Sequence, residues 1–213
     1  MERIDLTPEA MVRAALLLDR QGRMPEAIAA YQGVLARWPA LSDCWYRLAA
    51  LQRNTRQFSA ALSSYQEALD RGVKKPEEVH LNRGVIYADH LRRDDAAERE
   101  LLAALALNPA YVPALMNLAN LHEDLGRQEP ALAAYERILE LDPGSRQALA
   151  RYANIKTFTT LDDPLIEQLR RALAEPNTSA ADRASLGFAL GPSSGWLPAI
   201  RGSIRCLQRC ESR

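Results

Sequence analysis

Cysteine and lysine are both scarce in this chain. Cys44 lies far from Cys206 and Cys210, and three cysteines in 213 residues leave an odd thiol and no disulfide framework. Such usage is typical of a reducing compartment. Basic residues are almost all arginine, and none of the few lysines follows a glycine-rich loop. A phosphate-binding loop that ends in Gly-Lys is therefore excluded.

An excess of charge of either sign is also missing. The formal net charge is +0 at pH 7, and acidic and basic residues are interspersed. Electrostatic binding to nucleic acid or to an anionic membrane needs a basic patch, so neither partner is expected. Glu2 and Asp5 stand where a signal peptide would begin with basic residues, and no apolar run is long enough to span a bilayer. We expect a cytoplasmic protein.

Clusters of catalytic or metal-binding residues are lacking as well. His80, His90 and His122 do not have the spacing of a His-Glu-x-x-His zinc helix, and Cys206 with Cys210 has no second pair of ligands. We interpret His122 as a packed core or groove-edge side chain. We expect no metal, no cofactor and no catalysis by this chain.

Two acidic motifs are interpreted as helix starts instead of acid-base sites. Asp162 and Asp163 precede Pro164, an order typical of an N-cap followed by proline in the first turn. Ser179 followed by Asp182 has the spacing of a cap with an acidic third residue. Helices are therefore predicted to begin at both places.

What the sequence does contain is a repeat. Four alanines recur at steps of 34, 36 and 34 residues: Ala27, Ala61, Ala97 and Ala131. Each is followed four residues later by a large side chain: Tyr31, Tyr65, Leu101 and Tyr135. A period near 34 predicts helix-turn-helix units that bury a shared core only by stacking. The large residues are expected to be buried, since each fills the space beside a small residue where two helices approach closely.

From about residue 7 to about residue 158 the chain resembles tetratricopeptide repeats. Gly22 lies at the turn of the first unit, Trp45 at the aromatic position of the second and Gly84 at the small position of the third. The later anchors of the third unit come one residue late, which predicts an insertion in the turn near "HLRRDD". The resemblance implies an all-α, right-handed superhelical solenoid. We expect a repeat array over residues 1–158 with about four repeats and a fifth first helix, a helical linker or capping pair over 159–190, and an atypical tail over 191–213.

Members of this family usually hold an extended or helical peptide in a concave groove lined by the first helix of each repeat. Mapped onto this chain, the resemblance gives five candidate peptide-binding residues: Arg47, Asn82, Asn117, Asn120 and Asn154. An asparagine amide both donates and accepts, so it can pair with a peptide backbone of any sequence. The other interpretation is that these residues are solvated or cap neighbouring turns. The function expected from the resemblance is a scaffold that binds a protein or peptide.

A clamp for the carboxylate of a chaperone tail, the best-known use of such repeats, needs lysines in the groove. The corresponding positions of this chain hold Val12, Tyr46, Leu81 and Met116. That partner class is disfavoured. Arg47 and Arg151 would still suit an acidic peptide.

Residues 159–190 resemble a different segment. A helix that begins with "DDP" is followed by a polar linker and a helix containing "DRASLGFALG". This order looks like the link between the repeats and the catalytic part of bacterial tetratricopeptide-repeat sulfotransferases. In that family a further helical pair follows, and then a domain that uses 3'-phosphoadenylyl sulfate. The alternative function is a substrate-presenting or oligomerising arm of a sulfotransferase whose catalytic domain is absent from these 213 residues.

Nothing after Gly191 matches that family. The tail "PSSGWLPAIRGSIRCLQRCESR" is enriched in Arg, Cys, Ser and Gly, as GC-rich coding DNA often is when it is read out of frame. Our hypothesis is a truncated or frameshifted family member, and the other interpretation is a natural disordered end. Under the hypothesis the last helix lacks a partner. Leu186, Phe188 and Leu190 are then expected to be partly exposed and to favour self-association.

Overall fold

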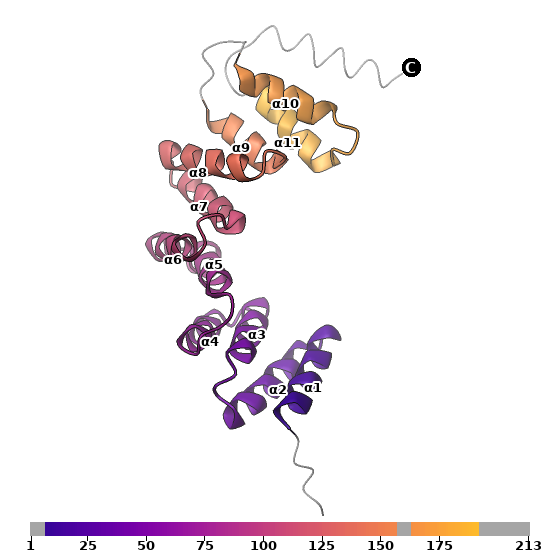
Figure 1. Ribbon diagram of the computed structural model, residues 1–213, viewed down its shortest axis with the longest axis vertical. Coiled ribbons are helices and arrows are strands. Elements are labelled where there is room, and N and C mark those ends of the chain that lie inside the picture. Colours follow the sequence, from indigo (N-terminus) through magenta and orange to yellow (C-terminus); the bar gives the residue numbers. More distant parts are fainter. Residues whose placement is uncertain (1–6, 157–162, 192–213) are drawn as a thin grey trace, which may run out of the picture. The chain divides into compact units, whose positions relative to one another are not determined.

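The computed structural model describes residues 7–156 and 163–191, and every regular element in these ranges is helical (Figure 1). The elements are α1 (Pro8–Arg20), α2 (Met24–Arg37), α3 (Ser42–Asn54), α4 (Phe58–Asp70), α5 (Pro76–Val85), η1 (Ile86–His90), α6 (Asp94–Leu107), α7 (Val112–Asp124), α8 (Gln128–Leu141), α9 (Arg146–Ile155), α10 (Pro164–Ala174) and α11 (Ala180–Leu190). The expected all-α class is confirmed for this part of the chain. Of the predicted tail, all but Gly191 lies outside the described residues.

The chain divides into two compact units, Met1–Ala114 and Leu115–Arg213, and the division falls within α7. In the first unit each helix packs on the next, from α1 through α6. In the second unit α8 packs on α9, and α9, α10 and α11 pack on one another. We call α1, α3, α5, α7 and α9 the first helices, and α2, α4, α6 and α8 the second helices.

The turns between first and second helices need a residue with a left-handed backbone. Gly22 and Gly126 take this conformation with φ of 72° and 70°. In the second and third repeats the same conformation falls to Arg56 and Arg92, with φ of 62° and 52°. A side chain there costs about 1–2 kcal/mol that glycine does not pay. The predicted place of Gly22 at a turn is confirmed.

The extra residue of the third repeat lies within the end of its first helix. There η1 takes a π-helical turn, in which the Leu91 amide donates to the Ile86 carbonyl at 3.1 Å, five residues earlier. A π-turn absorbs one residue without ending the helix. The insertion predicted in the following turn is thus placed about one turn earlier, ending at His90.

The small and large anchors of the repeat meet in the core. Tyr31, Tyr65 and Tyr135 are completely buried, and Leu101 is 1% exposed. Gly84 shows why one partner must be small, because a Cβ atom added to it would lie 3.0 Å from Cγ of Leu101. The predicted burial of the large residues is confirmed.

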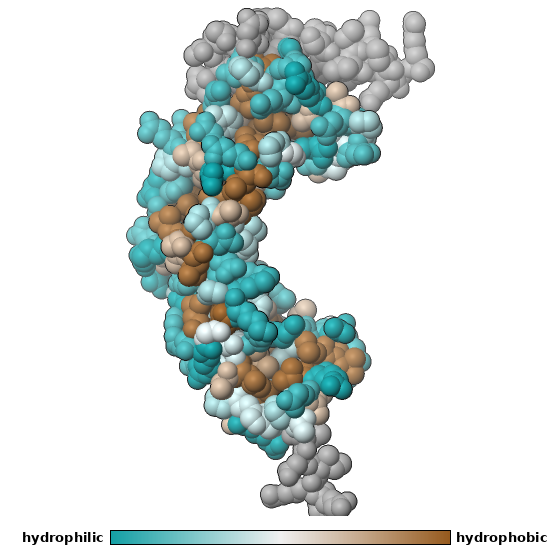
Figure 2. All heavy atoms as spheres, viewed as in Figure 1, coloured by the Kyte–Doolittle hydropathy of each residue, from teal (hydrophilic) through white to brown (hydrophobic). Residues whose placement is uncertain are grey.

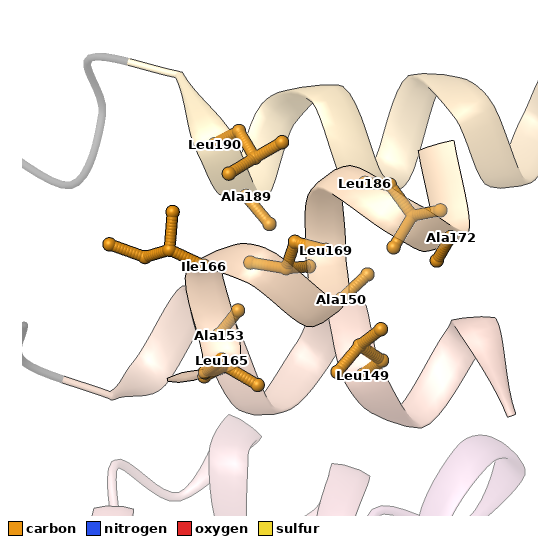
Figure 3. Close-up of a cluster of buried hydrophobic side chains, with 10 residues drawn as sticks. All are labelled: Leu149, Ala150, Ala153, Leu165, Ile166, Leu169, Ala172, Leu186, Ala189 and Leu190. Carbon is orange, nitrogen blue, oxygen red and sulfur yellow. The ribbon is translucent and has the colours of Figure 1, made fainter. Parts of the chain in front are cut away.

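One hydrophobic cluster joins α9, α10 and α11 (Figure 3). Leu149, Leu169 and Leu186 point toward one another from the three helices in this close-up. Both predicted caps are present: the Asp163 carboxylate accepts from the Leu165 amide at 2.9 Å, and the Ser179 hydroxyl accepts from the Asp182 amide at 3.0 Å.

The expected exposure of the last helix is wrong for two of its three residues. Leu186 is completely buried and Leu190 is 8% exposed, whereas Phe188 is 62% exposed. The physical reason is that α11 finds its packing partners in α9 and α10.

The surface of each unit is largely polar on the face that Figure 2 shows, with apolar residues visible between the helices. On α8, Glu136, Arg137 and Glu140 are exposed, as expected for a solvated face. None of the described helices combines the length and the apolar character that crossing a membrane requires.

Candidate peptide-binding groove

In the first unit a polar link joins the first helices α3 and α5. Arg53 of α3 donates to the side-chain oxygen of Asn82, whose amide nitrogen donates to the Glu78 carbonyl at 2.7 Å. The Tyr46 hydroxyl donates to the Glu78 carboxylate at 3.2 Å. Both ends of the Asn82 amide are therefore engaged by this chain itself, and the side chain braces α3 against α5.

In the second unit a similar link joins α7, α8 and α9. Arg151 of α9 pairs with the Glu123 carboxylate of α7 at 3.1 Å. The Tyr135 hydroxyl of α8 lies 2.8 Å from the second oxygen of Glu123 and 2.8 Å from the side-chain oxygen of Asn120. The hydroxyl has a single proton, which it donates to Glu123 or to Asn120 but not to both at once, and the link holds two first helices together.

The two links occupy corresponding places in their repeats. Each joins a residue near the C-terminal end of one first helix, Arg53 or Glu123, to a residue in the middle of the next, Asn82 or Arg151. Asn82 and Asn120 are among the candidate groove residues expected from the sequence, and Arg151 was expected to suit an acidic peptide. Some of the predicted ligands therefore have a bracing contact within the chain, and their ligand role stays a prediction.

The other candidates differ in what they contact. Arg47 is exposed on α3, near the Tyr31 phenol, and forms no ion pair within the described part of the chain. Asn154 is exposed on α9, and its side chain makes no hydrogen bond with any residue in the described ranges. Asn117 lies on α7, one turn before Asn120, and is partly buried. Arg47 and Asn154 are therefore the candidates most available to a ligand.

A groove of about 540 Å³ lies between α9 and α11. Four residues of α9 and five of α11 line it: Gln147, Ala150, Arg151, Asn154, Ala181, Asp182, Ala184, Ser185 and Phe188. Each of the four α9 residues has a counterpart 34 positions later among the α11 residues. Phe188, for example, is the counterpart of Asn154. The side of α11 that faces the groove therefore continues the repeat period. Our sequence reading missed this side, although the period of 34 was the signal that would have found it.

The buried tyrosines predict a loss of stability in alkali. Burial raises the pKa of Tyr31 from 10.0 to about 12 and also raises the pKa values of Tyr65 and Tyr135. Phenols of the unfolded chain ionise near pH 10, so the stabilising effect is complete below about pH 10 and is lost as the pH rises through about 12. Urea unfolding at a series of pH values should show a free energy of unfolding that falls across this window. A free energy that stays flat there would contradict the prediction, and Tyr31→Phe should make the fall shallower.

No cluster of three or more His, Cys, Asp or Glu side chains in the described ranges is arranged to hold a metal ion. His122 of α7 is 7% exposed, which confirms its interpretation as a packed side chain. Cys206 and Cys210 lie outside the described residues.

The repeats match known family models. Models described as tetratricopeptide repeat match residues 3–42, 46–104 and 112–145, which together make up more than half of the chain. The chain is a tetratricopeptide-repeat protein. The resemblance proposed from the spacing of small and large residues is thereby confirmed.

Two curated relatives share the repeats within much longer proteins. The chain is 27% identical over 141 residues to the mouse protein O-mannosyl-transferase TMTC1, a match that covers 65% of this chain and 15% of the relative. It is also 27% identical over 141 residues to the general transcriptional corepressor ssn6 of Schizosaccharomyces pombe, covering 66% and 13%. The chain thus spans less than a sixth of the length of either relative.

Solved structures agree on the fold. A tetratricopeptide-repeat protein from Parabacteroides merdae superposes with a TM-score of 0.69 at 22% identity, covering 86% of this chain and 73% of that one. YrrB, described as a TPR protein with an unusual peptide-binding site, gives a TM-score of 0.64 at 18% identity, covering 87% and 93%. These likenesses confirm the predicted solenoid of helix-turn-helix repeats.

Proposed function

We propose that this protein is a scaffold that binds an extended segment of a partner protein on the polar side of first helices within a unit, and has no catalytic activity of its own. The observation that carries the proposal is the division of the first helices into two sides. One side buries the repeat core, and the other keeps polar residues such as Arg47 and Asn154 accessible. Structural similarity to YrrB, a TPR protein with an unusual peptide-binding site, supports the proposal.

Rigid spacing of the first helices also supports binding. The links Arg53–Asn82 and Arg151–Glu123 each hold two first helices of one unit together. A surface that is already ordered loses less conformational entropy when a ligand binds. We therefore assign the linked residues to shaping the surface, and Arg47 with Asn154 to contacting the ligand.

A library of random dodecapeptides displayed on phage, selected against the full chain, tests the proposal. Selected peptides should bind about threefold to tenfold more weakly when Arg47→Ala or Asn154→Ala removes a hydrogen-bonding group. Arg99→Ala is the matched control, since Arg99 is exposed on the second helix α6. If no peptide is selected, or if all three variants bind alike, the proposal fails.

A second candidate function comes from the helices after the repeats. The caps at Asp163 and Ser179 begin α10 and α11, the two helices expected from the resemblance to the sulfotransferase link, and both helices pack on α9. We propose as the alternative that the chain serves as the repeat arm of a sulfotransferase. Sequencing the gene from the codon of Leu186 onward tests this: a sulfotransferase domain in a neighbouring frame would support it, and the absence of such a frame would reject it.

A further inference from the structure

The groove between α9 and α11 has an apolar wall that the described chain leaves open. Phe188 is 62% exposed, while Leu186 and Leu190 of the same helix are buried in the core. Ala150, Ala181 and Ala184 also line the groove, so four of its nine lining residues are apolar. The volume of about 540 Å³ lies within the range of about 300–1,000 Å³ that is usual for ligand sites.

The charged side chains that line this groove already have partners within the chain. Arg151 pairs with Glu123 at 3.1 Å. The Asp182 carboxylate accepts from the Ser179 hydroxyl at 2.8 Å. A charged ligand would have to compete with these contacts, whereas an uncharged apolar ligand would not. The complementary ligand for this groove is therefore apolar at its centre.

Two amide side chains of the groove lining are suited to a peptide backbone. Asn154 and Gln147 are exposed on α9, and an amide side chain pairs equally well with a backbone carbonyl or N–H. An apolar residue of an extended peptide would then place its side chain in the groove and its backbone near these amides. This is the usual arrangement of a binding site, with an apolar centre and polar groups that fix orientation.

We propose that the α9–α11 groove binds an uncharged stretch of the partner peptide through one bulky apolar side chain, which packs on Phe188. The proposal rests on the proposed function and gives it a preferred ligand chemistry. Aromatic residues in a concave site are the usual source of binding free energy, because burial of their rings removes a large apolar area from water.

The experiment uses the same phage library of random dodecapeptides and the full chain. Selected peptides should share a Leu, Phe, Tyr or Trp flanked by uncharged residues. Synthetic copies, measured by fluorescence polarisation, should bind about tenfold more weakly to Phe188→Ala and to Ala184→Glu, which places a carboxylate in the groove. The matched control is Leu17→Ala, since Leu17 is a 57% exposed apolar residue of α1 and should not affect binding.

The outcomes distinguish a failure of this proposal alone from a failure of the proposed function. If Arg47→Ala or Asn154→Ala weakens binding while Phe188→Ala and Ala184→Glu do not, the apolar anchor is wrong and the scaffold function stands. Peptides selected for charge, without an apolar residue in common, would overturn the anchor in the same way. If sedimentation shows that Phe188→Ala only abolishes self-association, the occupant is a second copy of this chain. If no peptide binds, both proposals fail.

Discussion

Replacing Tyr65 with alanine is expected to lower the free energy of unfolding by about 3–5 kcal/mol. The ring is completely buried in a cluster with Ala49, Val79 and Ile86, so it lies at the junction of α3, α4 and α5. Truncation removes the transfer free energy of the ring and leaves a cavity that neighbouring helices fill only in part. Urea unfolding followed by circular dichroism measures the loss.

The matched control for Tyr65→Ala is Leu102→Ala in the same unit. Leu102 is 49% exposed on α6, and its truncation should change the free energy of unfolding by only about 0.5 kcal/mol. Equal losses for the two variants would show that Tyr65 does not hold the repeats together.

Replacing a buried tyrosine with phenylalanine removes only the hydroxyl, so it separates the contribution of hydrogen bonding from that of ring packing. The Tyr65 hydroxyl is buried and has no hydrogen-bond partner among the described residues. Tyr65→Phe should therefore be neutral or slightly stabilising. The Tyr135 hydroxyl lies 2.8 Å from Asn120 and Glu123, so Tyr135→Phe should cost about 1–3 kcal/mol. Equal losses of unfolding free energy for Tyr65→Phe and Tyr135→Phe would show that the Tyr65 hydroxyl also has a hydrogen-bond partner.

The repeat could be predicted from the sequence because its packing depends on single small and large residues at a fixed period. Ala61 and Tyr65 are four residues apart, which puts them on one face of a helix, and both are completely buried. Helix ends could be predicted for the same reason. The cap of α10, for example, is a hydrogen bond between Asp163 and Leu165, which are two residues apart. Such features depend on near neighbours in the chain, and a pattern of spacing captures them.

The candidate site was less predictable because its contacts join distant parts of the chain. Asn82 accepts a hydrogen bond from Arg53, which lies 29 residues earlier in the chain. Arg151 donates to Glu123, which lies 28 residues earlier. A spacing rule places these residues on one face but does not tell which side chains satisfy one another. The packing of α11 on α9 was missed for a related reason: residues 159–190 were expected to form a helical linker or capping pair, and the period of 34 was not extended into them.

The third repeat departs from the apolar pattern in a way that predicts a second large effect. His80 takes the place that Trp45 has in the second repeat, four residues before the small position. Its Nδ1 lies 2.7 Å from the Glu100 carboxylate, whose other oxygen pairs with Arg83 at 2.8 Å. Arg83 also donates to Gln66 at 2.6 Å. The side chains of Glu100 and Arg83 are only 14% and 15% exposed, so this is a largely buried ionic cluster joining α4, α5 and α6.

Glu100→Ala is expected to cost about 3–5 kcal/mol, because it leaves the Arg83 guanidinium buried without a carboxylate. Glu140→Ala is the control: Glu140 pairs with Arg137 at 2.7 Å on an exposed surface, and its loss should cost at most about 1 kcal/mol. Urea unfolding of both variants gives the comparison, and equal small losses would contradict the buried cluster.

Replacing Arg83 and Glu100 together with leucine should recover much of the loss, because apolar side chains of similar size need no charge partner. Recovery would show that apolar packing at this place stabilises the fold as well as the ionic cluster does.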